Sequence, residues 1–158
     1  MTRFLLLASL TALLALSAPA QDPPRPPGGF PIQLDADRAI SYSDGYRTLL
    51  DVRYPTTAPP PTGWPCVMVV HGGSGSRHTG WVMRIADMLA RSGYVTLAYD
   101  TGNNGATLVL NPPGRRDDPR RMTDLAEIFQ FAANLYGGTL DASRLAVMGK
   151  SGGGKHAL

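Results

Sequence analysis

One serine near the end of the 158-residue sequence is surrounded by glycines at a spacing suited to covalent catalysis. Gly149-Lys150-Ser151-Gly152-Gly153 fits the pattern Gly-x-Ser-x-Gly and directly follows an apolar run. A nucleophilic serine stands on a sharp turn between a strand and a helix, so the residues two positions before and after it need almost no side chain. The helix that follows directs its N-terminus at the serine, which favours negative charge there. Since the chain contains 18 glycines, the pattern gains its weight from this strand-to-helix context.

A second glycine turn, His71-Gly72-Gly73-Ser74-Gly75, follows another apolar run. Hydrolysis of an ester or amide passes through a tetrahedral oxyanion, which N–H donors stabilise. We expect one donor to be the backbone N–H of Gly152, directly after the serine, and the other to come from the exposed N–H groups of the His71-Gly72-Gly73 turn. The two turns together predict serine-hydrolase chemistry, which needs neither a metal nor a cofactor.

The three histidines are weaker candidates for the base that such a serine requires. His71 is expected to form a hydrogen bond within its own turn, and His78 is expected to lie in a loop. His156 comes five residues after Ser151 on the same helix, so its side chain should point away from the hydroxyl. Cys66 is the only cysteine and lies in an apolar run, so we expect a buried core residue and no disulfide framework.

Two other interpretations of the serine turn remain open. Residues 149–156 (GKSGGGKH) nearly fit the phosphate-binding loop Gly-x-x-x-x-Gly-Lys-[Ser/Thr], which also lies between a strand and a helix. His156 stands where that loop needs a hydroxyl for Mg²⁺, and a nucleotide-binding protein has no reason to place His-Gly-Gly after an earlier strand. The third interpretation is a glycine turn without chemistry, in a binding or scaffold protein that keeps the same fold.

The remaining sequence predicts the elements that position these turns. A hairpin is expected around Asp44-Gly45, at one edge of a sheet, with strands over residues 37–43 and 46–54. Strands buried on both faces are expected over residues 66–70, 94–99 and 144–148, and helices over residues 79–92 and from Asp118-Pro119 onward. The expected apolar sides are Trp81, Ile85, Met88 and Leu89 in the first helix and Met122, Leu125, Ile128, Phe129, Ala132 and Leu135 in the second. This alternation predicts an α/β fold with a mostly parallel sheet, helices on both faces and ligands at the carboxyl ends of the strands.

The N-terminus predicts export. Residues 1–20 combine Arg3, an apolar run and Ala18-Pro19-Ala20, the layout of a secretory signal peptide, which implies a periplasmic or extracellular protein. Residues 21–30 are a proline- and glycine-rich linker, and residues 31–158 carry the domain pattern. The net charge of +3, which becomes +2 without Arg3, gives no footprint for nucleic acid or for an anionic membrane.

Three stretches together resemble a known family of enzymes. Residues 67–100, residues 141–158 and the hairpin sequence of residues 44–55 are similar to dienelactone-hydrolase-like and prolyl-oligopeptidase-like α/β hydrolases. The resemblance implies Ser151 as nucleophile and Gly152 and Gly73 as oxyanion donors, with Ser74 as a further possible donor. It further implies an ester, lactone or peptide substrate. It also implies that the triad acid and histidine follow in the order Ser, Asp, His, beyond Leu158. We therefore expect the N-terminal part of an α/β-hydrolase domain, truncated after the nucleophile turn and inactive by itself.

Overall fold

The computed structural model describes residues 22–102, 104–111 and 121–156, with the side chains of residues 108, 121–124 and 156 outside that description. The predicted signal peptide and the expected helix start at Asp118-Pro119 therefore lie outside the described residues. A five-stranded sheet forms the centre, in the order β1-β2-β4-β3-β5. Its strands are β1 (Ile32–Ser41), β2 (Arg47–Pro55), β3 (Trp64–Val70), β4 (Val95–Tyr99) and β5 (Leu140–Gly149). The helices are α1 (Gly80–Arg91), α2 (Thr107–Leu110), α3 (Arg121–Tyr136) and the 3₁₀ turn η2 (Ser151–His156).

The sheet is mixed. β1 and β2 form the predicted hairpin, and β2 also pairs antiparallel with β4. β3 lies parallel to both β4 and β5, because the connections through α1 and α3 return the chain to the same end of the sheet. β1 begins earlier than predicted, at Ile32, and its register shifts between Asp35 and Arg38.

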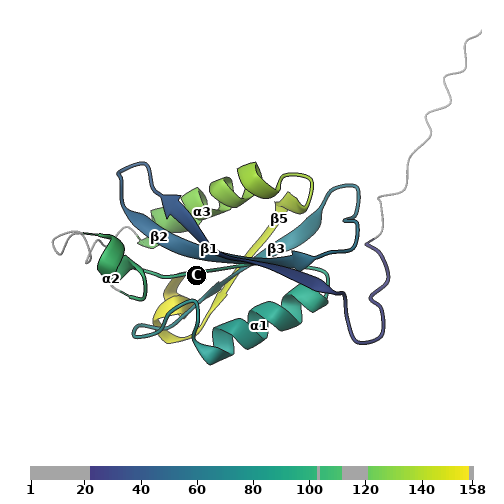
Figure 1. Cartoon of the computed structure of the whole chain (residues 1–158), viewed down its shortest axis with the longest axis horizontal. Coiled ribbons are helices and arrows are strands. Elements are labelled where there is room, and N and C mark those ends of the chain that lie inside the picture. The colour runs from purple at the N-terminus through teal and green to yellow at the C-terminus, as the bar shows by residue number, and fades with distance from the viewer. Residues whose placement is uncertain (1–21, 103, 112–120, 157–158) are drawn as a thin grey trace, which may run out of the picture.

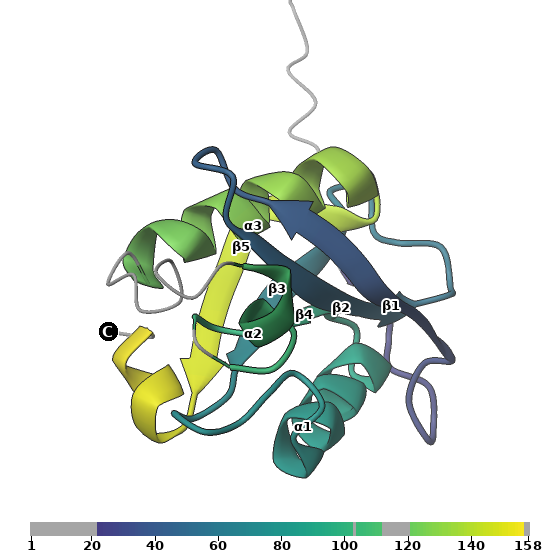
Figure 2. The ribbon, with the colours of Figure 1, turned by 60° about the vertical axis from the view of Figure 1, so that its left-hand side comes forward.

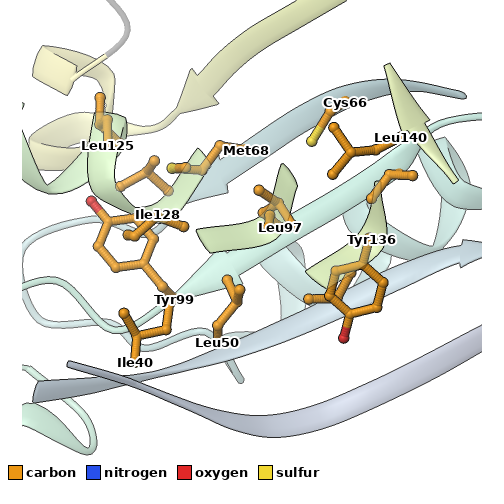
Figure 3. Packing of buried hydrophobic residues seen from close by; sticks show 14 of the residues in the cluster. Ile40, Leu50, Cys66, Met68, Leu97, Tyr99, Leu125, Ile128, Tyr136 and Leu140 are labelled. Atoms are coloured by element: carbon orange, nitrogen blue, oxygen red, sulfur yellow. The ribbon is translucent and has the colours of Figure 1, made fainter. Parts of the chain in front are cut away.

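Helices cover the two faces, as the sequence predicts (Figure 1). On one face, Ile128 and Ala132 of α3 pack with Leu50 and Leu97 in the larger core cluster (Figure 3). On the other face, Val82 and Ala86 of α1 pack against Val69 of β3. Cys66 lies in the larger cluster as expected, and burial raises the pKa of its thiol to about 12, so the thiol is protonated at neutral pH. None of the described helices combines the length and apolar character that a membrane span requires.

Parts of the predicted core are wrong. Met88 and Leu135 are 52% and 43% exposed. The predicted Leu125, Ile128 and Ala132 of α3 are buried in the larger core cluster, and the predicted Trp81, Ile85 and Leu89 of α1 pack against the smaller one. The prediction missed Tyr136 in α3 and the fully buried Val82, Ala86 and Ala90 in α1. The segment at residues 144–148 is not buried on both faces, since Leu145 is 43% exposed. The reason is its position: β5 is an edge strand whose described strand partner is β3 alone.

Candidate functional site

The serine turn has the tight geometry that its glycines predict. Ser151 has a φ of 56°, in the left-handed region that residues with a side chain rarely adopt, and its side chain is exposed. A Cβ on Gly153 would collide with the carbonyl oxygens of Val70 and His71, and one on Gly149 would collide with the backbone of Gly153. The turn therefore lies directly against the end of β3 and presents the serine outward.

The two glycine turns meet at the carboxyl ends of β3 and β5 (Figure 2). These strands are neighbours, with Val70 paired to Gly149, so the segments that follow them start side by side. A Cβ placed on Gly152 would lie 3.2 Å from the backbone nitrogen of Gly73, and one placed on Gly72 would lie 3.6 Å from the Cβ of Ser151. Among the described residues, neither Gly73 nor Gly152 donates its N–H to an acceptor. The backbone segments that carry these two N–H groups therefore approach each other closely beside Ser151.

An open pocket of about 330 Å³ lies over this junction. Its lining residues come from both turns and from the start of α1: Gly72, Gly73, Ser74, Gly75, Thr79, Trp81, Lys150 and Ser151. The size is at the lower end of the range for small-molecule sites. The pocket therefore contains the predicted nucleophile, one of the predicted donors and Ser74, the further possible donor.

His71 is buried and engaged at both ring nitrogens. Its Nε2 accepts the backbone N–H of Thr101 at 3.0 Å, which leaves Nδ1 to donate to the carbonyl oxygen of Gly72 at 2.6 Å. The bond to Gly72 lies within the turn, as expected for His71. The bond from Thr101, which follows β4, was not predicted. His78 lies in the loop before α1, as expected, and the side chain of His156 is outside the described residues. Within the described part of the chain, no hydrogen bond links Ser151 to a histidine or a carboxylate.

A buried charge network anchors the Gly72–Gly75 turn, and the sequence interpretation missed it. The backbone N–H of Arg77 donates to Asp100 Oδ1 at 2.8 Å, and its buried guanidinium pairs with Asp100, Asp51 and Asp37. Burial alone would lower the pKa of Arg77, but the three carboxylates raise it above its usual value. Asp100 also accepts the N–H of Ala106 at 2.8 Å. The one available signal was the place of Asp100, directly after a strand, where polar residues of such sheets reach the ligand-binding edge.

The same network contains a group of possible metal ligands. Asp37, Asp51 and His78 place ligand atoms within 4.8 Å of one another. The guanidinium of Arg77 already pairs with both aspartates, and His78 Nε2 lies 3.4 Å from Asp51 Oδ2. A cationic side chain therefore occupies the position that a metal ion would take.

The geometry does not favour a phosphate-binding loop. Such a loop must be wide enough for backbone N–H groups to surround a phosphate. Here Gly149 and Gly153 approach so closely that a single Cβ would not fit between them, and the N–H of Gly153 donates back to the carbonyl of Lys150 at 3.1 Å. The turn presents one side chain outward and encloses no space.

Several esterases of known structure share the fold of this chain. Esterase Est22 superposes with a TM-score of 0.62 at 20% identity, over 79% of this chain and 37% of its own. Brefeldin A esterase, a bacterial homologue of human hormone-sensitive lipase, gives a TM-score of 0.60 at 20% identity, over 94% of this chain and 37% of its own. A cold-adapted esterase from an Arctic intertidal metagenomic library gives 0.62 at 16% identity, over 89% of this chain and 58% of its own. No protein-family model and no curated protein sequence matches the chain.

These likenesses cover between 79% and 94% of this chain. The chain spans 37% of the length of the first two esterases, so it corresponds to part of each of those molecules. At these identities the likeness concerns the fold. The chain has the α/β-hydrolase fold.

Proposed function

We propose that the complete protein is an exported serine hydrolase that cleaves carboxylic esters through an acyl-enzyme. Ser151 is the nucleophile, and the N–H groups of Gly152 and Gly73 stabilise the oxyanion. The observation that carries the proposal is the close approach of the two glycine turns beside an exposed serine with a left-handed backbone, which supports Ser151 as nucleophile and Gly152 and Gly73 as donors. The esterase neighbours support an ester as the bond that is cleaved.

The reaction would proceed in two displacements. The hydroxyl oxygen of Ser151 attacks the ester carbonyl, and the carbonyl oxygen becomes an oxyanion beside the two N–H groups. Collapse of this intermediate expels the alcohol and leaves an acyl-serine, which water hydrolyses by the same route. The base that takes the serine proton is expected from the resemblance to be a histidine oriented by an aspartate, both after residue 158.

A fluorophosphonate probe tests the nucleophile, using protein expressed from the complete gene. We expect covalent labelling at Ser151, located by peptide mass spectrometry, and its complete loss in Ser151→Ala. Ser74→Ala is the matched control, because Ser74 lines the same pocket and its substitution keeps the backbone N–H. Labelling that persists in Ser151→Ala contradicts the proposal. Absence of labelling in a protein that contains a triad histidine and aspartate supports the non-catalytic alternative.

Export is part of the proposal and rests on the sequence of residues 1–20. Cleavage after Ala20 would give a mature protein that begins at Gln21. N-terminal sequencing of the protein recovered outside the cytoplasm tests this, and a mature N-terminus at Met1 contradicts it.

A further inference from the structure

We propose that Lys150 makes the pocket selective for esters whose acyl chain carries a carboxylate. The inference rests on the proposed function and adds a substrate class to it. Lys150 directly precedes Ser151, lines the same pocket and is exposed. Its flexible four-carbon stem carries a compact cation, which attracts an anion without requiring one fixed geometry.

Among the described residues, no acidic side chain lines the pocket. Lys150 is the only charged residue of the eight that line it, and the others are three glycines, Ser74, Thr79, Trp81 and Ser151. Lys150 has no ion-pair partner within the described part of the chain. Asp51 and Asp100, which contact the loop after the Gly72–Gly75 turn, differ from Lys150 because both are buried and already paired with Arg77. An anionic substrate would therefore meet a net positive field at Ser151.

The place of Lys150 also indicates which part of the substrate it contacts. The ammonium group belongs to Lys150 and the nucleophile to the next residue, Ser151. A substrate anion that contacts Lys150 must therefore be connected to the scissile carbonyl by a short chain. A carboxylate four methylene groups away matches the length of the lysine stem. The pocket volume of about 330 Å³ suits such a small acyl group, and Trp81 supplies an apolar wall for its methylenes. The structure thus points to half-esters of short dicarboxylic acids.

A pair of esters that differ only in charge tests the inference. Mono-4-nitrophenyl adipate carries the carboxylate, and 4-nitrophenyl heptanoate replaces it by an ethyl group of similar size. With protein from the complete gene, we expect kcat/KM to be higher for the adipate. We expect Lys150→Met to lower the adipate-to-heptanoate ratio by about five- to tenfold, as removal of one partly exposed ion pair predicts. Lys150→Glu should reverse the preference, and added salt should reduce that of the wild type.

Lys155 provides the matched control. It is also exposed and lies on η2, but it does not line the pocket. Lys155→Met should leave the ratio within about twofold of the wild type, since exposed charges outside the pocket are screened by solvent. Hydrolysis of both esters with a ratio that Lys150→Met does not change overturns the inference and leaves the proposed function intact. Hydrolysis of neither ester, together with absence of fluorophosphonate labelling, overturns the proposed function itself.

Discussion

At the scale of single residues, the site depends on positions where a side chain cannot be accommodated. Ser151 accepts a left-handed backbone, which costs about 1–2 kcal/mol for a residue with a side chain. The strain persists because Gly149 and Gly153 allow the turn to pack directly on the end of β3. The sequence predicted this requirement correctly, because the absence of a side chain is visible in the sequence itself.

The substitution Gly153→Ala tests how tightly the turn is fixed. The added methyl group would collide with the carbonyl oxygens of Val70 and His71, so we expect destabilisation by about 1–3 kcal/mol and slower fluorophosphonate labelling of Ser151. Thermal unfolding and the labelling rate measure the two effects. Gly154→Ala is the control, since a Cβ there would make an ordinary contact of 3.5 Å with Gly149. Equal unfolding temperatures and equal labelling rates in the two variants would show that the turn is not closely packed.

At the scale of elements, the Gly72–Gly75 turn is connected to β4 at both of its ends. His71 contacts Thr101 on one side, and Arg77 contacts Asp100 on the other. β4 also pairs directly with β3, so the donor turn is supported by the two central parallel strands. We infer that Arg77 is a positioning residue, which acts on the oxyanion donor through the backbone of its own loop.

Removal of the Arg77 guanidinium should therefore be costly. Arg77→Met leaves Asp51 and Asp100 buried without their shared cation, and loss of one partner from a buried pair costs about 3–5 kcal/mol. Denaturant unfolding measures the loss. Arg84→Met, on the exposed side of α1, should change stability by less than about 0.5 kcal/mol. A similar small change in both variants would contradict a structural role for the Arg77 network.

The helices and strands could largely be predicted from the sequence, but the side-chain contacts between them could not. Apolar runs and turn residues located the hairpin, the three parallel strands and two helices, since these signals are local. The Arg77 network could not be found this way, because a buried arginine and a solvated one look alike in sequence. For the same reason the alternation of residues in β2 puts Asp51 and Arg53 on the face opposite Leu50 and Val52, but it does not show that α1 covers them, with Arg53 paired to Asp87.

At the scale of the whole molecule, the two edges of the sheet are unlike. The β1 edge has a register shift and carries Asp35, Asp37 and Arg38, which disfavour pairing with another strand. The β5 edge is a ten-residue strand in which Leu145 and Ala146 are exposed. A central strand and an edge strand can have the same apolar sequence, so the sequence could not show that β5 lies at an edge of the sheet.

The open β5 edge predicts self-association of residues 21–158 when they are produced alone. We expect oligomers or aggregates in size-exclusion chromatography, because an unprotected apolar edge pairs readily with other chains. Leu145→Lys should increase the monomeric fraction, since an edge lysine disfavours strand addition. Val109→Lys is the control, because it changes an exposed apolar residue away from the sheet. A wild-type segment that melts cooperatively as a monomer contradicts the prediction.

The interleaved strand order also determines when the pocket can assemble. The first four strands, over residues 32–99, can join once β4 has left the ribosome, because β4 pairs with both β2 and β3, which are already synthesised. Gly152 reaches Gly73 only after β5 has added beside β3, a contact between distant parts of the chain that forms late. A nascent chain therefore completes most of its sheet before the two glycine turns meet, and the pocket beside Ser151 is among the last features of this fold to form.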